Sequence, residues 1–167
     1  MDDEKPPASN ARKQKKARRS QTHFTLGEMW DDVLSNKLPT LAHHEFGIVG
    51  ELAEAIRLLM GWNVESEDVL GIQGDDIRHI HKNHGELHFN NKGQIAGEKR
   101  KGQLPITKAD FEDLPKIFAN PTFTKVTDHV WGEVLIASCK IEGHLTAVMI
   151  HAPAQKMLHI KSMRKYA

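Results

Sequence analysis

The sequence predicts an α+β fold, in which N-terminal helices precede a three- to four-stranded antiparallel β-meander. In several segments before residue 121, apolar residues recur every three or four positions, as on helices that pack against a core. From Val134 onwards the pattern changes to alternation, which is typical of half-buried strands. The turns between these strands are short, which favours antiparallel neighbours.

Two helices are expected between residues 24 and 62. The first has an apolar stripe that ends before Pro39 and consists of Leu26, Met29, Trp30, Val33 and Leu34. The second is expected over about residues 41–60, although Gly47 and Gly50 weaken its N-terminal half. Stripes of this kind are more often buried in a core or against a partner helix than used to bind a ligand.

A short helix is predicted for the segment GDDIRHIHKNHG, which spans residues 74–85. Asp75 is the expected N-cap, and Asp76 favours the positive end of the helix dipole. Gly85 should end the helix. Ile77, Ile80 and His84 then share one stripe, and His79, Lys82 and Asn83 share a more polar face.

A loop and another helix are expected between this segment and the strands. Residues 86–104 are polar and contain glycine, as loops do. Thr107 and Asp110 have the spacing of a capping box at the start of the next helix. Pro115 should break or kink that helix, which ends before Pro121.

Three strands are predicted in the C-terminal third of the chain, over residues 134–141, 145–152 and 157–163. A fourth, weaker strand is expected near residues 123–126. Short turns at 142–143 and 153–155 separate the three stronger strands, so the natural topology is a meander.

The charge is distributed unevenly along the chain. Its 23 Lys and Arg nearly balance 22 Asp and Glu, but residues 1–20 carry seven basic against three acidic residues. Residues 1–22 have almost nothing apolar to bury, so we expect a disordered basic arm that touches phosphates or anionic lipid, or that merely aids solubility. The expected organisation is this arm, a helical extension over 23–62, and one α+β domain over 63–167.

A soluble, cytoplasmic protein is the expectation from the remaining composition. No apolar run approaches the roughly 18 residues that a membrane span needs, and the N-terminus has no apolar signal-peptide core. The single cysteine, Cys139, cannot form an internal disulfide. With one Tyr and three Trp, a stacking platform like that of RRM sheets is not expected.

A cluster of histidines in the 74–85 helix and after it suggests two kinds of chemistry. His81, His84 and His88 could in principle hold zinc, but Gly85 should break the register and no thiolate pair is present. His79 and Lys82, on one face, would instead pair a general base or acid with a cation. For His84, a buried role at the helix C-terminus and a catalytic role both stay open. No cofactor motif is found.

The last predicted strand carries a second group of polar and cationic residues. Strict alternation would place His159 and Lys161 on one face and Ser162 and Arg164 on the other. Cations on a terminal strand can bind a phosphate backbone, and they equally can protect a sheet edge from aggregation. The residues alone do not decide between these two roles.

Three motifs in this order resemble the phage-associated barnase–EndoU–colicin–RelE-like nucleases. They are IRHIHKNHG at 77–85, LPITKADFEDLPKIFANP at 104–121, and LHIKSMRKY at 158–166. The resemblance covers about residues 63–167. It implies a metal-independent ribonuclease fold with N-terminal helices packed on a four-stranded antiparallel sheet, and a phage, prophage or toxin context.

By motif match, the resemblance implies six active-site residues: His79, Lys82, His84, Lys161, Ser162 and Arg164. The implied activity is cleavage of RNA by His-based acid–base catalysis with phosphate stabilised by cations and with no cofactor or metal. RNA is the implied partner, together with a cognate inhibitor or a phage head protein, in the cytoplasm or the virion.

Three alternatives remain beside this interpretation. The chain could be a non-catalytic phage structural module that docks through residues 24–60. It could be a nucleic-acid-binding protein that uses the basic arm. It could also be a zinc hydrolase built on His81, His84 and His88.

Overall fold

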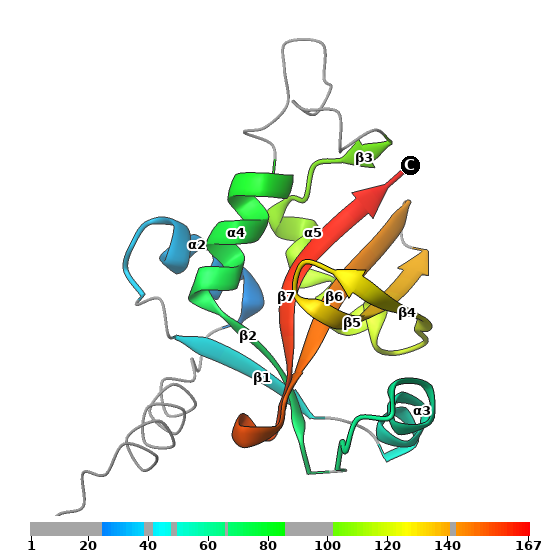
Figure 1. Ribbon diagram of the computed structural model, residues 1–167. Coiled ribbons are helices and arrows are strands. Elements are labelled where there is room, and N and C mark those ends of the chain that lie inside the picture. The colour runs from blue at the N-terminus through cyan, green and yellow to red at the C-terminus, as the bar shows by residue number, and fades with distance from the viewer. Residues whose placement is uncertain (1–24, 39–41, 48–49, 66, 86–101, 141–142) are drawn as a thin grey trace, which may run out of the picture.

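The computed structural model describes residues 25–38, 42–47, 50–65, 67–85, 102–140 and 143–167. It shows an α+β fold around one seven-stranded sheet, with strand order β1-β2-β7-β6-β5-β4 and β3 paired with the end of β7 (Figure 1). The expected basic arm at 1–22 lies outside the described residues. None of the described helices is long and apolar enough to cross a membrane.

The sheet is built from strands at both ends of the chain: β1 (His43–Gly47), β2 (Val69–Gln73), β3 (Gln103–Leu104), β4 (Thr122–His129), β5 (Gly132–Lys140), β6 (His144–Ala152) and β7 (Met157–Tyr166). The helices are α2 (Leu26–Leu34), α3 (Gly50–Met60), α4 (Gly74–His84), α5 (Lys108–Glu112) and α6 (Leu114–Ile117). A short 3-10 turn, Pro153–Gln155, connects β6 to β7.

The predicted meander is confirmed, because β4, β5, β6 and β7 pair consecutively and antiparallel. The weaker fourth strand, expected near residues 123–126, is confirmed as β4 and is longer than expected. The sheet is nevertheless larger than predicted, because β2 adds to β7 in parallel and β1 adds to β2. Residues 103–104, predicted as loop, form β3 against Lys165 and Tyr166.

The predicted helix at 41–60 is wrong in its N-terminal half. Residues 43–47 form edge strand β1, and the helix α3 begins only at Gly50. Glycine is a poor helix former, and pairing with β2 gives the β1 backbone the hydrogen bonds that a helix would have supplied. The first predicted helix is confirmed as α2, which Thr25 caps through a capping box with Glu28.

Helix α4 begins directly after β2 ends (Figure 1). β2 pairs only with the first residues of β7, and α4 then lies beside the rest of β7. Its N-cap is Gln73 rather than the predicted Asp75, and the backbone N–H of Gln73 donates to the Asp76 carboxylate at 2.9 Å. Ile77 and Ile80 are fully buried in the core. Asp76, on an adjacent face of α4, contacts His159 of β7.

The predicted helix at 107–118 exists, and its capping box and its break at Pro115 are confirmed. Thr107 caps α5 by accepting from the backbone N–H of Asp110, and α6 restarts at Leu114 with Pro115 in its first turn. Phe111 of α5 is fully buried and packs against Trp30 of α2, with ring centroids 5.1 Å apart. These contacts place α2 in the same core as the sheet.

The core-facing residues of β7 change phase in the middle of the strand. Leu158 and Ile160 belong to the core, and the next core residue is Met163. The register explains this, because Met149 of β6 lies opposite Ile160 while Val148 lies opposite Ser162. Lys161 is therefore the additional residue of a β-bulge, which redirects the side chains that follow it.

The β4–β5 hairpin curls over β6 and β7 and brings its tip toward α4 (Figure 1). Only Val130 and Trp131 connect the two strands, since His129 pairs with Gly132. Gly132 adopts a φ of 85°, which residues with a side chain rarely reach and glycine adopts freely. This tight turn holds the hairpin tip over the sheet.

Candidate active site

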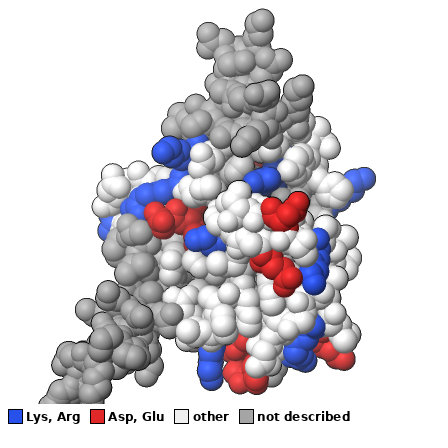
Figure 2. Space-filling model, in the orientation of Figure 1, with Lys and Arg blue, Asp and Glu red and all other residues white. Residues whose placement is uncertain are grey.

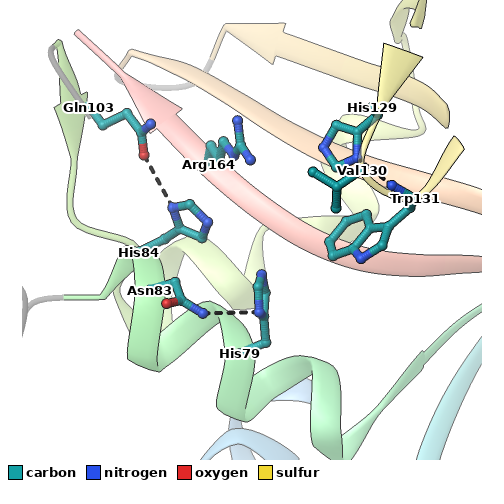
Figure 3. Close-up of a pocket in the computed structure, with 8 residues that line it drawn as sticks. All are labelled: His79, Asn83, His84, Gln103, His129, Val130, Trp131 and Arg164. Atoms are coloured by element: carbon teal, nitrogen blue, oxygen red, sulfur yellow. Dashed lines mark hydrogen bonds between the residues drawn. The ribbon is translucent and has the colours of Figure 1, made fainter. Parts of the chain in front are cut away.

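A cavity of about 450 Å³ lies where α4, β3, β7 and the β4–β5 turn meet (Figure 3). It is lined by His79, Asn83, His84, Gln103, His129, Val130, Trp131 and Arg164. Figure 3 shows the α4 side chains on one wall and the turn residues on another, with Arg164 between them. Residues far apart in the sequence thus form one polar and aromatic cavity.

His79 is a half-buried imidazole on the wall formed by α4. Burial lowers its pKa from the ordinary value because desolvation disfavours the charged ring, and the positive charges of Lys161 and Arg164 lower it further while Asp76 opposes them. At neutral pH the ring is therefore predominantly neutral and can accept a proton. Its Nδ1 is hydrogen-bonded to the Asn83 side-chain amide at 3.0 Å, which fixes the ring orientation.

His84 lies one turn further along α4 and is only 6% exposed. Its Nδ1 donates to the Gln103 carbonyl oxygen at 3.2 Å, so β3 orients this second ring. The His79 and His84 ring centroids are 5.8 Å apart in an edge-to-face arrangement. Of the two roles left open for His84, the structure shows features of both, since the ring is buried and also lines the cavity.

Lys161 and Arg164 of β7 both act on His79, although strict alternation would place them on opposite faces. That prediction is wrong because the bulge at Lys161 shifts the phase of the strand. Arg164 lines the cavity directly. The Lys161 ammonium lies 5.8 Å from the centroid of the Trp131 ring, within cation–π range.

Asp76 at the start of α4 ties this helix to β7. Its carboxylate is 3% exposed and lies 2.5 Å from His159 Nε2 and 3.5 Å from Lys161 Nζ. The same oxygen that contacts His159 also accepts the Gln73 backbone N–H. Asp76 therefore fixes the distance between α4 and the strand that supplies Lys161 and Arg164.

Two residues carried over by motif match lie elsewhere. Lys82 is exposed on α4 and does not line the cavity. Ser162 is fully buried, and its hydroxyl has no hydrogen-bond partner among the residues that the structure describes. The structure therefore gathers His79, His84 and Arg164 at one cavity, with Lys161 beside it, and leaves Lys82 and Ser162 outside its lining.

Five residues of the cavity were not predicted as site residues from the sequence: Asn83, Gln103, His129, Val130 and Trp131. Asn83 was detectable, because it follows His79 by four positions on a helix face. No sequence signal places the turn at 129–131 opposite α4, since this contact depends on how far the hairpin curls. Gln103 was assigned to a loop.

The part of the chain that the structure describes contains no metal site for the zinc alternative. His88 lies outside the described residues, and no group of three or more His, Cys, Asp or Glu side chains in the described ranges is placed to hold a metal ion. His81 instead contacts the Trp30 ring at 5.9 Å, away from the cavity lining.

The described residues form no large basic patch on the face of the molecule that Figure 2 shows. In the view of Figure 2, Lys and Arg side chains are interspersed with Asp and Glu. Positive charge near the cavity is instead local, and it comes from Lys161 and Arg164 on β7.

Comparison with known proteins gives one match. Searches of curated proteins and of solved structures return none. A sequence model of the family described as phage-Barnase-EndoU-ColicinE5/D-RelE like nuclease3 matches residues 47–167. The matched region begins before residue 63, where the resemblance was expected to start. It includes α3 and every strand from β2 to β7. The chain therefore belongs to this family of phage-associated barnase–EndoU–colicin–RelE-like nucleases.

Proposed function

We propose that the protein is an endoribonuclease that cleaves RNA by metal-independent transesterification at the cavity between α4, β7 and the β4–β5 turn. The observation that carries the proposal is the position of His79. Its pKa is lowered by burial, and it lies beside the cations Lys161 and Arg164 at an open cavity. A neutral base next to positive charge suits the removal of a hydroxyl proton beside a phosphate.

In the proposed reaction the 2′-hydroxyl of the bound RNA replaces the Asn83 amide N–H at Nδ1 of His79, and this nitrogen accepts the 2′-hydroxyl proton. The 2′-oxygen then forms a bond to phosphorus, and the bond from phosphorus to the 5′-oxygen breaks. Arg164 and Lys161 offset the negative charge that grows on the phosphate oxygens. The products are a 2′,3′-cyclic phosphate and a 5′-hydroxyl.

His84 is the proposed donor of the proton that the leaving 5′-oxygen takes up. The Gln103 side-chain carbonyl oxygen accepts from Nδ1 of His84 and orients the ring, so Nε2 is the nitrogen that we propose passes the proton on. No step is assigned to Lys82 or Ser162. As an exposed cation on α4, Lys82 adds only to the positive field around the cavity.

The test is incubation of the purified protein with RNA in the presence of EDTA. We expect cleavage that EDTA does not inhibit, and a loss of about 10²–10⁴-fold in rate for His79→Ala and for His84→Ala. His144→Ala is the matched control, because this histidine is exposed at the start of β6 and does not line the cavity. Inhibition by EDTA, or unchanged rates in both cavity variants, would overturn the proposal.

The proposal also covers the biological setting. RNA is the proposed substrate, and the site of action is the cytoplasm of the host cell or the virion. A cognate inhibitor or a phage head protein is the proposed protein partner. If the purified protein binds RNA without cutting it, the non-catalytic alternative, a nucleic-acid-binding or phage structural module, replaces this function.

A further inference from the structure

Two aromatic rings stand at the β4–β5 turn, on the cavity wall that faces α4 (Figure 3). The His129 and Trp131 ring centroids are 4.8 Å apart, and the Trp131 centroid is 5.7 Å from that of His79. Trp131 is partly exposed, and Val130 between the two rings is 89% exposed. None of His129, Val130 and Trp131 belongs to the hydrophobic core, so core packing does not explain why apolar side chains are exposed at this turn.

The turn is also held in one conformation. The backbone N–H of Trp131 donates to His129 Nδ1 at 3.2 Å, which orients the histidine ring beside the indole. The His129–Gly132 pair closes the two-residue connection, and after a shift of register the pairing of β4 and β5 resumes at Val126 and Val134. A preorganised aromatic surface loses little conformational freedom when a flat ligand binds, and this is the property of a recognition surface.

Positive charge lies directly beside these rings. The Lys161 ammonium is 5.8 Å from the Trp131 ring centroid, and Arg164 lines the same cavity. Proteins that bind single-stranded nucleic acids combine these two elements, cations for the phosphates and an aromatic face for a base. Here they are close enough to contact one nucleotide.

We propose that Trp131, supported by His129, is a stacking platform for one unpaired nucleobase of the substrate. This inference rests on the proposed ribonuclease function and specifies its substrate class as single-stranded RNA. The base stacks at the hairpin tip, and the attached phosphate lies at Lys161 and Arg164, next to His79. The platform is sequence-tolerant, because every base offers a flat face.

Paired RNA cannot use this platform, because the bases of a duplex are already stacked on both neighbours. We therefore expect single-stranded oligonucleotides to be cleaved in preference to duplexes of the same sequence. Removing the indole should reduce that preference, because duplex RNA gains nothing from it.

The first experiment measures binding of a single-stranded 2′-deoxy oligonucleotide, which lacks the attacking hydroxyl and stays intact. At fixed salt concentration, Trp131→Ala should weaken its affinity by about 5- to 150-fold, the range of one base–aromatic stack. Trp131→Phe keeps a flat ring and should lose much less. Trp62→Phe is the matched control, because this tryptophan stacks on His151 and does not line the cavity.

The second experiment measures kcat/KM on single-stranded and duplex RNA for the same variants. For Trp131→Ala we expect kcat/KM to fall on single-stranded RNA and to stay unchanged on duplex RNA. Trp131→Phe should recover part of the lost kcat/KM. Cleavage with unchanged kcat/KM and unchanged strand preference in Trp131→Ala would overturn the platform while leaving the ribonuclease function intact. If no variant cleaves RNA but the deoxy oligonucleotide still depends on Trp131, the proposed function fails and the platform stands.

Discussion

Replacing Asp76 with alanine is expected to lower the free energy of unfolding by about 3–5 kcal/mol, because the protein loses two hydrogen bonds to a buried carboxylate. The carboxylate is 3% exposed and connects the start of α4 to β7. Without it, His159, which is 8% exposed, loses its acceptor, and the partly exposed Lys161 ammonium loses its counter-charge.

The magnitude follows from the contacts of this one side chain. Asp76 accepts the Gln73 backbone N–H at 2.9 Å and lies 2.5 Å from His159 Nε2. Hydrogen bonds to a charged group contribute about 1.5–3 kcal/mol each, so these two give roughly 3–6 kcal/mol. The contact with Lys161 at 3.5 Å adds little, because that side chain is 27% exposed and solvent screens the pair.

Urea unfolding followed by circular dichroism measures this loss, and thermal unfolding should show a midpoint lower by about 6–20 °C. Asp75→Ala is the matched control, because Asp75 is exposed in the same first turn and has the same relation to the helix dipole. An Asp76→Ala protein within about 1 kcal/mol of the Asp75→Ala protein would refute the assignment of Asp76 as the connection between α4 and β7.

Three further predictions concern the cavity and the strand β7 beside it. Because burial lowers the pKa of His79, the acidic limb of the pH profile of kcat/KM should lie below pH 6.5. Lys161→Gln should move this limb to higher pH, because it removes a positive charge that disfavours the protonated ring. A limb that does not move in the pH–rate profile of Lys161→Gln would contradict this coupling. Arg164→Ala should reduce kcat about 10²–10³-fold, as loss of a transition-state donor does, and Arg164→Lys should recover only part of it; steady-state kinetics on RNA decide this. Ser162→Ala should leave the free energy of unfolding unchanged or raised, because the buried hydroxyl has no partner among the described residues, and urea unfolding checks it.

The C-terminal strands were predictable from the sequence because each buries one face. Alternating apolar residues in β5 and β6 match the residues that reach the core, such as Leu135, Ala137, Leu145 and Ala147. The helix α4 was predictable for a similar reason, since its apolar spacing and its terminal Gly85 are local signals. Its N-cap was wrong by two positions because Asp76 caps through the N3 position rather than from the cap itself.

The edge strand β1 was not predictable from local pattern. An apolar spacing compatible with a helix continues through residues 43–47, and only the presence of β2 alongside makes the extended form favourable. Tertiary pairing therefore outweighed the local pattern at this edge. The same holds for β3, whose two residues pair with the end of β7.

Three of the residues that line the candidate site could be named from the sequence, but their geometry could not. His79 and His84 follow from one helix, and Arg164 follows from the last strand. The bulge at Lys161 leaves no mark in the sequence, yet it decides which residues of β7 reach His79. The contribution of Trp131 depends on the curl of a hairpin from the far edge of the sheet.

The most direct test of the account is the cleavage of a single-stranded DNA oligonucleotide that contains one ribonucleotide, with EDTA present. The account predicts a single cut on the 3′ side of that ribonucleotide, with a 2′,3′-cyclic phosphate on one product and a 5′-hydroxyl on the other, and no cut in the His79→Ala protein. Mass spectrometry of the products identifies these ends. Cleavage at deoxynucleotides, or products with a 5′-phosphate, would contradict the proposed attack by the 2′-hydroxyl.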